Sequence, residues 1–452
     1  MFYNLIMEPS WAAWHWMADL DYELCVRECV ALGAEPAQFE DCDGMGFVAL
    51  PMGHKWSPFL AEGCLEHILD KAGLPASARV LHGESAPELC TEEESELGPS
   101  RVHMPYLDDF LGLALGGDRV EAKERAGALL ARCKEALHSE ELECHKDDLG
   151  QQVTSLGMVL DVQGSEKVLR PEPVAFTELL LATRAVLRRG RVSPCTLSKI
   201  VGKWAWWISL RPCIYSVLGD TYLFTRYPEG RAGEREWHRA QALPSEVRRE
   251  LRALLRLSPF VRAELSLETS KRIYATDACL SGGGVAYGKV TPDRAATMYR
   301  RTSSWEGTTT YFDEVEAAQW CEETEWKVAI ATRWRRAPKD GSAIPIDSLE
   351  GEAALLGLRH RLRGGERKCR ALYLQDNQAF LGSVRKGRSS APRLLFQCRR
   401  VAAHLLFGEI YASWVYVPSG LNPADEASRR WEPGPRVPRE KAETATGGVP
   451  PP

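Results

Sequence analysis

Two adjacent aspartates, Asp108 and Asp109, are the residues of this chain that most directly suggest chemistry. They lie between two apolar runs, Val102 to Leu107 and Phe110 to Leu115, in the pattern of a β-hairpin with both carboxylates at its turn. Neighbouring carboxylates repel each other unless a divalent cation neutralises them. An Asp-Asp pair is also common in ordinary turns, because aspartate favours turn conformations. The pair therefore indicates a metal site only if other residues support it.

A second set of acidic residues lies in the last third of the chain. In-line hydrolysis of a phosphodiester needs one Mg²⁺ to activate water and a second to stabilise the leaving oxygen. Mg²⁺ prefers hard oxygen ligands, and acids at the carboxyl ends of neighbouring strands can supply them. The chain has 62 Asp and Glu residues, so any single one is usually an ordinary surface residue. The candidates follow strand-like runs or open an apolar helix: Asp277, Glu350, Asp376 and Asp425.

These acids need a particular series of elements to position them. The apolar runs predict, in order, strands at 274–277 and 282–287, a helix from Leu349, a strand at 371–375, a helix, and a strand at 414–417. Asp425 follows the last strand after a short loop. Residues 292–347, which include four tryptophans, fit this order less well and receive no assignment.

This order resembles the ribonuclease H fold, an α/β domain with a mixed five-stranded sheet. The resemblance implies two Mg²⁺ or Mn²⁺ ions per active site, with Asp277 bridging both, Glu350 and Asp376 holding one, and Asp425 the other. Glu352 is the alternative to Glu350. In the family the helix glutamate is followed by alanine at the third and fourth positions, which favours Glu350. The loop before Asp425 lacks the histidine that many of these enzymes carry.

The first part of the chain resembles the palm of reverse transcriptases from retrotransposons, of the gypsy-like and especially the DIRS-type kind. Five segments match the family's motifs in order: Phe2–Leu5, Ala49–Gly53 with Trp56–Phe59, Tyr106–Asp109, Lys146 and Leu156–Asp161. The resemblance implies that Asp108 and Asp109 are catalytic metal ligands. It also implies that a primer–template duplex and deoxynucleotides are substrates of the palm, and that an RNA·DNA hybrid is the substrate of the ribonuclease H domain.

One departure from the family concerns the first catalytic aspartate, which lies just before the Phe-Tyr pair in those enzymes. This sequence starts at Met1-Phe2-Tyr3. The polymerase site is therefore expected to be incomplete as given, without its fingers region, and the chain is not expected to extend a primer. The alternatives are a decayed or domesticated element that only binds nucleic acid, a ribonuclease H enzyme whose palm serves as a clamp, and a structural protein in which the motifs are accidental.

The distribution of charge indicates where nucleic acid would bind, although the net charge is −5. From Arg359 to Arg400 there are twelve Lys and Arg residues against two acids. A solvated helix face usually mixes both signs, whereas a basic patch beside a metal site can neutralise phosphates. The helical middle of the chain adds two lysines beside several tryptophans. These tryptophans are either core residues or surfaces on which nucleic-acid bases stack. The candidates are Lys199, Lys203, Arg359, Arg361, Arg363, Arg385, Lys386 and Arg388.

Composition is that of an intracellular protein of the cytoplasm or nucleus. No segment reaches the roughly 18 apolar residues of a membrane span. The stretch Met1 to Met17 contains Glu8 and Pro9 and lacks a basic start, so it does not resemble a signal peptide. The 13 cysteines show no paired metal-ligand spacing, which favours reduced thiols.

These observations predict a multidomain α+β protein. The expected domains are an incomplete palm at 1–165, a helical thumb and connection at 166–265, a ribonuclease H-like domain at 266–432 and a disordered tail at 433–452.

Overall fold

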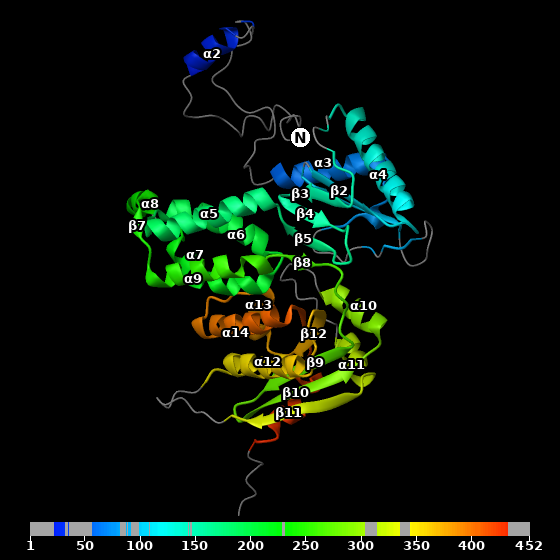
Figure 1. The fold of residues 1–452 in the computed structure, drawn as a ribbon, viewed down its shortest axis with the longest axis vertical. Coiled ribbons are helices and arrows are strands. Elements are labelled where there is room, and N and C mark those ends of the chain that lie inside the picture. Colours follow the sequence, from blue (N-terminus) through cyan, green and yellow to red (C-terminus); the bar gives the residue numbers. More distant parts are fainter. Residues whose placement is uncertain are drawn as a thin grey trace, which may run out of the picture. The chain divides into compact units, whose positions relative to one another are not determined.

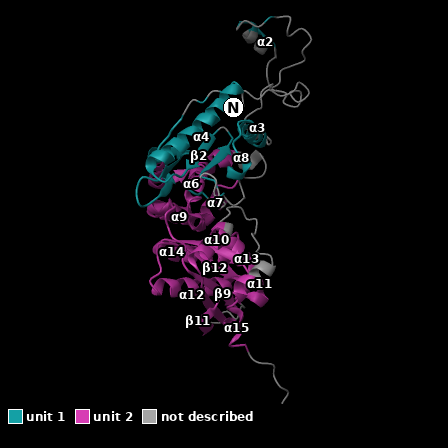
Figure 2. Cartoon of the chain, turned by 90° about the vertical axis from the view of Figure 1, so that its right-hand side faces the viewer, with its two compact units in different colours: residues 1–175 teal, residues 176–452 magenta. Residues whose placement is uncertain are grey.

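The structure is a computed structural model that divides into two compact units, residues 1–175 and 176–452 (Figure 2). It describes residues 22–31, 57–81, 99–107, 109–142, 147–227, 231–302, 314–334 and 344–432, with isolated positions between some of these segments. Several sequence predictions lie outside the described residues: the first palm-like segment, most of the second, Asp108, Lys146 and the tail at 433–452.

The first unit combines helices with short antiparallel strands (Figure 1). Its elements are α2 (Tyr22–Ala31), α3 (Ser57–Lys71), η4 (Ala76–Ala78), β1 (Arg101–Tyr106), β2 (Asp109–Ala114), α4 (Arg119–Ser139), β3 (Gln152–Ser155), β4 (Met158–Asp161) and β5 (Val168–Pro171). Helices α3 and α4 share a core that includes Leu65, Leu69 and Leu129. Asp118 caps α4, because its carboxylate accepts hydrogen bonds from two backbone amides of the first turn.

Two hairpins of this unit fall where the sequence predicts turns. Strands β1 and β2 are antiparallel, and Tyr106 pairs with Asp109 across the turn. Strands β3 and β4 are joined by Leu156 and Gly157, both with positive φ, as a two-residue hairpin turn requires. β5 continues this antiparallel meander beside β4.

The second unit begins with helices. These are α5 (Pro173–Arg189, whose first residues belong to the first unit), α6 (Pro194–Ile208), η5 (Pro212–Leu218), α7 (Gly219–Phe224), α8 (Arg231–His238), α9 (Ser245–Leu257) and η6 (Ser258–Phe260), with short strands β6 (Arg191–Val192), β7 (Gln241–Ala242) and β8 (Ala263–Glu264). Trp204 and Trp207 of α6 are buried, and the indole Nε1 of Trp204 donates to the Thr183 hydroxyl at 2.9 Å. These two tryptophans are core residues, whereas Trp206 on the same helix is exposed.

A five-stranded mixed sheet forms the rest of the unit, in the order β11-β10-β9-β12-β13 (Figure 1). The strands are β9 (Arg272–Ala278), β10 (Gly282–Lys289), β11 (Trp326–Arg333), β12 (Cys369–Gln375) and β13 (Ile410–Tyr416). β9, β10 and β11 are antiparallel neighbours, and β12 is parallel to both β9 and β13. The predicted α+β class with a five-stranded mixed sheet is confirmed.

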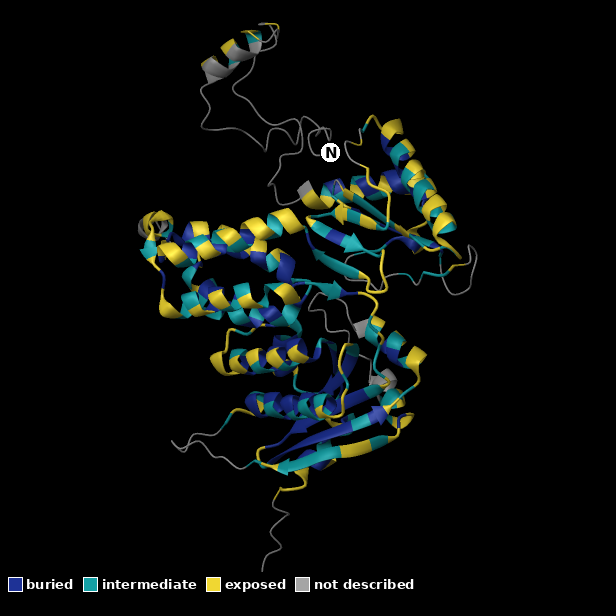
Figure 3. Cartoon of the chain, in the orientation of Figure 1, coloured by how far each residue is buried: buried dark blue, intermediate teal, exposed yellow. Residues whose placement is uncertain are grey.

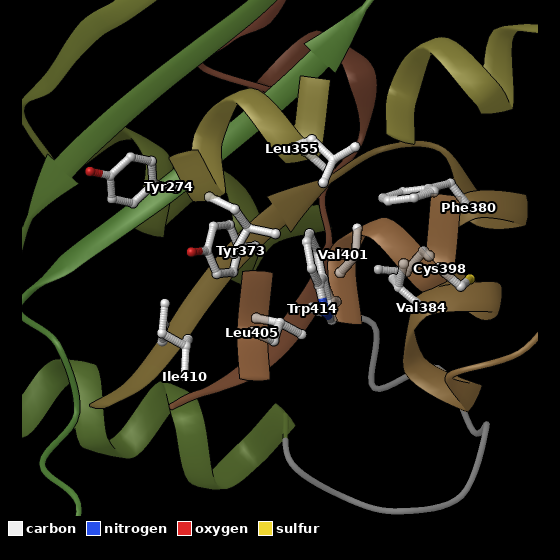
Figure 4. Close-up of a cluster of buried hydrophobic side chains, with 14 of the residues drawn as sticks. Tyr274, Leu355, Tyr373, Phe380, Val384, Cys398, Val401, Leu405, Ile410 and Trp414 are labelled. Atoms are coloured by element: carbon white, nitrogen blue, oxygen red, sulfur yellow. The ribbon is translucent and has the colours of Figure 1, made fainter. Parts of the chain in front are cut away.

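Helices pack against this sheet, and its strands β9, β10 and β12 are mostly buried (Figure 3). The helices are α10 (Pro292–Thr302), α11 (Glu314–Glu322), α12 (Ile346–Arg363), α13 (Gln378–Lys386), α14 (Pro392–Gly408) and α15 (Asp425–Arg429), with η7 (Ser419–Leu421). Successive strand residues point to opposite faces. Tyr373 and Trp414 accordingly face a core shared with Leu355 of α12 and Val401 of α14 (Figure 4). Their strand neighbours face a second core on the other side.

Strand β11 was missed from the sequence. It lies in the stretch 292–347 that received no assignment, and it forms the edge of the sheet beside β10. An edge strand pairs on one side only, and no residue of β11 is fully buried. Its apolar run, Val328 to Ala331, is only four residues long, and such a short run does not distinguish a strand from a helix segment. Among the described residues, no helix has both the length and the apolar character that crossing a membrane requires.

Candidate metal centre

Three of the four predicted acids of the second unit come together at one edge of the sheet. Carboxylate oxygens of Asp277, Glu350 and Asp376 all lie within 4.8 Å of one another. Asp277 is near the end of β9, and Asp376 directly follows β12. Because β9 and β12 are parallel neighbours, their carboxyl ends meet at the same edge of the sheet. Glu350 reaches this edge from the first turns of α12, which packs on β9.

Burial makes this group electrostatically costly without a cation. Glu350 and Asp277 are only 3% and 4% exposed. Burial, together with the charges of Asp277 and Asp376, raises the pKa of Glu350 to about 9. Burial also raises the pKa of Asp277 to about 6, and the charges of Asp376 and Asp425 act in the same direction. A divalent cation would offset this cost by stabilising the charged carboxylates.

The donor set fits Mg²⁺ or Mn²⁺. All three groups offer carboxylate oxygens, the hard ligands that these ions prefer. One further oxygen supports the fit, since Oδ1 of Asp376 is buried and has no hydrogen-bond partner in the structure. Buried polar atoms are normally satisfied, so an orphaned oxygen in a cluster of acids suggests a ligand position for a cation.

A hydrogen-bond chain that the sequence did not reveal orients Glu350. The Thr276 hydroxyl donates to Oε1 of Gln375 at 2.6 Å, and Nε2 of Gln375 donates to Oε2 of Glu350 at 2.6 Å. All three side chains are buried. The only sequence signal for this role was a polar glutamine at the end of an otherwise apolar strand.

Replacement of Gln375 by methionine should weaken metal binding. Methionine keeps a similar volume but cannot donate to Glu350, and losing such a supporting hydrogen bond typically costs about 10- to 100-fold in metal affinity. Titration of the purified chain with Mn²⁺ in a calorimeter would measure this change. Gln378→Met, an exposed position on α13, is the control and should leave the affinity unchanged. Equal Mn²⁺ affinity of the two variants would refute the positioning role of Gln375.

Asp425 lies beside the three-acid group rather than within it. α15 begins at Asp425 and approaches β10 so closely that a Cβ on Gly284 would lie 2.4 Å from the Ala424 carbonyl oxygen. Only glycine permits this approach. The Asp425 carboxylate accepts a hydrogen bond from Nε of Arg429 at 2.7 Å, and its charge contributes to the raised pKa of Asp277.

The choice between the two helix glutamates agrees with the geometry. Glu350 belongs to the acidic group, whereas Glu352 forms an ion pair with Arg400 of α14.

The Asp108–Asp109 pair cannot be assembled from the described residues. Asp109 is exposed at the start of β2, and Asp108 lies outside the described residues. The metal role of this pair stays a prediction.

Arg361 is a correction to the predicted nucleic-acid surface. Its side chain is fully buried, so no ligand can reach it. Its Nε donates to the Tyr373 hydroxyl at 2.9 Å, its Nη2 donates to the Arg272 carbonyl at 2.8 Å, and its Nη1 is paired with Glu366. Arg361 therefore stabilises the core. A basic residue in a charge run cannot be assigned to the surface from sequence alone.

The basic stretch from Arg359 to Arg400 is also not one patch beside the acids. Arg359 and Arg363 lie about two and a half and about three and a half turns after Glu350 on α12, about 14 Å and 20 Å away at 1.5 Å per residue. Lys386 and Arg388 are exposed at the end of α13, the helix that follows Asp376. Arg385 is half-buried there, and its Nε donates to the Trp414 carbonyl at 2.7 Å. The remaining predicted cations, Lys199 and Lys203, are exposed one turn apart on α6.

Comparison with known proteins gives only distant structural matches. No protein-family model matches the sequence, and no curated protein matches it. Among solved structures, the foamy viral protease–reverse transcriptase dRH in complex with double-stranded DNA matches with 12% identity, a TM-score of 0.32 and 83% of this chain covered. The foamy viral protease–reverse transcriptase matches in complex with an RNA/DNA hybrid (13%, 0.32, 90% covered) and in complex with double-stranded DNA (13%, 0.31, 82% covered). This chain spans 52%, 42% and 60% of the lengths of those chains, respectively.

Proposed function

We propose that the ribonuclease H-like part of this chain, residues 266–432, is a metal-dependent nuclease that hydrolyses the RNA strand of an RNA·DNA hybrid. The observation that carries the proposal is the convergence of Asp277, Glu350 and Asp376 at the carboxyl ends of two parallel strands. Buried acids with strongly raised pKa values in one cluster are typical of a catalytic metal site.

Each acid has a part in holding the ions. Asp277, Glu350 and Asp376 would hold the divalent ions, and Asp425, which now accepts a hydrogen bond from Arg429, would be the fourth acid of the site. Bound ions would activate the attacking water and stabilise the leaving oxygen of the phosphodiester. Gln375 keeps Glu350 in position, so that the carboxylate needs no rearrangement when an ion binds.

Contacts to the hybrid would come from the cations at the end of α13. Lys386 and Arg388 are exposed there, and phosphates of the hybrid would release counterions on binding them. Only the RNA strand carries 2′-hydroxyls, which lets a protein distinguish it from the DNA strand.

Lys386→Gln should weaken hybrid binding without changing the cleavage rate at saturation. The log–log slope of affinity against salt should fall by about 0.9, because one phosphate contact is lost. Fluorescence anisotropy with a labelled hybrid in Ca²⁺ would measure it. Lys289→Gln, an exposed position on β10, is the matched control. A salt slope equal to that of the control would remove Lys386 from the interface.

We propose that residues 1–165 form the palm of a retroelement reverse transcriptase, of the gypsy-like or DIRS-type kind. Residues 166–265 would form the helical thumb and connection. The β1–β2 hairpin supports this reading, since it presents Asp109 beside its turn. Exposed Lys199, Lys203 and Trp206 of α6 would contact the primer–template duplex. A deoxynucleotide and Mg²⁺ would bind at Asp108 and Asp109.

A cleavage assay tests the nuclease proposal. The purified chain should cut an end-labelled RNA strand in a hybrid with Mg²⁺ or Mn²⁺, and chelation by EDTA should stop it. The same RNA as a single strand or in an RNA duplex should stay intact. Binding of the hybrid without metal-dependent cleavage would instead favour the alternative, a decayed or domesticated element that only binds nucleic acid.

A further inference from the structure

A basic cleft lies between α12 and α14, away from the metal centre. Its volume is about 450 Å³, and its lining includes Arg359, Arg363, Arg367, His404 and Phe407. The two helices pack side by side within the second unit (Figure 1). No acidic residue lines the cleft.

The three arginines of the cleft are not neutralised by acids of the described residues. Elsewhere in this unit arginines pair with glutamates, as in Arg272–Glu366 at 3.1 Å and Arg399–Glu250 at 2.7 Å. None of the three cleft arginines forms such a pair within the part of the chain that the structure describes. α12 and α14 both end near the cleft, and each helix C-terminus contributes about half a negative charge. Three full positive charges exceed these dipoles, so the cleft keeps an excess positive charge.

His404 holds one of these arginines in place. Its Nδ1 lies 2.7 Å from the Arg400 carbonyl oxygen. Because a carbonyl oxygen only accepts hydrogen bonds, Nδ1 carries the proton and donates to it. The lone pair of Nε2 then accepts from Nε of Arg359 at 3.3 Å. This contact uses Nε and leaves the terminal nitrogens of the guanidinium, the bidentate donors that fit a phosphate.

Phe407 adds an aromatic surface at the same place. Its side chain is 65% exposed, and the Arg367 guanidinium lies 4.5 Å from its ring centroid. An exposed aromatic beside several arginines is the combination that binds unpaired bases together with their phosphates. Bases of a duplex are already stacked on each other and cannot use such a ring. An acidic peptide would use the arginines but would gain little from the exposed ring.

We propose that this cleft binds a single-stranded nucleic acid segment, with phosphates on Arg359, Arg363 and Arg367 and a base on Phe407. The site is separate from the carboxylate group that would cut the hybrid, because it lies at the opposite end of α12. It depends on neither bound metal nor cleavage, so it stands or falls independently of the proposed nuclease activity.

Binding of a short fluorescein-labelled oligothymidine to the full chain in EDTA tests the site. Arg363→Gln combined with Arg367→Gln should weaken binding about tenfold and flatten the log–log salt slope by about 1.4, since two phosphate contacts are lost. Both side chains are exposed, so folding should be unaffected. Lys271→Gln combined with Lys289→Gln makes the same change of charge on exposed positions outside the cleft and should bind as the unmodified chain does.

Phe407→Ala separates stacking from charge. It should weaken binding about tenfold with an unchanged salt slope, because the lost contact is uncharged. An oligonucleotide containing 5-iodouracil should also crosslink to Phe407 under ultraviolet light.

Three results would overturn the proposal. One is equal oligothymidine affinity for the cleft double variant and the lysine double variant. Another is crosslinking to α6 alone, at the exposed Trp206. The third is competition by polyglutamate as effective as that by unlabelled oligothymidine, which would assign the cleft to an acidic protein partner.

Discussion

Asp376→Asn is expected to abolish cleavage of the RNA strand while leaving hybrid binding nearly intact. The substitution removes one negatively charged metal ligand and leaves every predicted phosphate contact in place. Asp376 also carries the orphaned oxygen that fits a ligand position. Loss of about 4 kcal/mol of transition-state stabilisation would slow cleavage by about 10³-fold. Cleavage rates with Mg²⁺, together with anisotropy of the labelled hybrid in Ca²⁺, would measure both effects.

The matched control for this experiment is Asp293→Asn. Asp293 is exposed in the first turn of α10 and has no part in the acidic group, so its variant should cleave normally. Cleavage by Asp376→Asn at the unmodified rate would place the activity elsewhere in the chain, or in a contaminant, and would remove the support for the nuclease assignment.

Glu350→Gln should stabilise the metal-free protein at neutral pH. The pKa of Glu350 is raised to about 9 in the folded protein, so the folded state binds a proton that the unfolded state releases. The contribution of Glu350 to the free energy of unfolding is therefore fully present below the pKa that this group has in the unfolded chain. This contribution is lost as the pH rises from that value toward 9. At pH 7 the free energy of unfolding is lower than at low pH by on the order of 3 kcal/mol because of Glu350, and a neutral glutamine causes no such loss.

Thermal unfolding in EDTA across pH 5 to pH 9 would measure this difference. The melting temperatures of the unmodified chain and of Glu350→Gln should be close at pH 5 and should diverge as the pH rises. Mg²⁺ or Mn²⁺ should raise the melting temperature of the unmodified chain and have little effect on the variant, which lacks a ligand. Glu426→Gln, exposed on α15, should behave as the unmodified chain does. A variant less stable than the unmodified chain at pH 8 in EDTA would contradict the account of Glu350.

The sequence predicted least well which charged side chains are buried. Arg361 and Arg363 are two residues apart in one basic run, yet Arg361 is fully buried and Arg363 is exposed. Which face of α12 is buried depends on what packs against it. The hydrogen bond from Arg361 to the Tyr373 hydroxyl exists only because the helix packs on the sheet.

The sequence by itself determined the two strand-end aspartates and the strands that carry them. Asp277 and Asp376 each lie at the end of a short, mainly apolar run rich in residues that favour strands, and such a run is typical of a strand buried on both faces. The choice of Glu350 followed from the resemblance, because Ala353 and Ala354 occupy the third and fourth positions after it, where the family has alanines.

Only the tertiary structure decided which side chains meet. It joined Gln375 to Glu350, left Asp425 beside the three-acid group, and brought Arg367 to Phe407 across two helices far apart in the sequence. It also placed the edge strand β11 beside β10, in a stretch that received no assignment from the sequence. The physical reason is the same throughout. Local sequence patterns show which face of a helix or strand is apolar. The charges and hydrogen bonds of a site depend instead on how the helices and strands pack against one another.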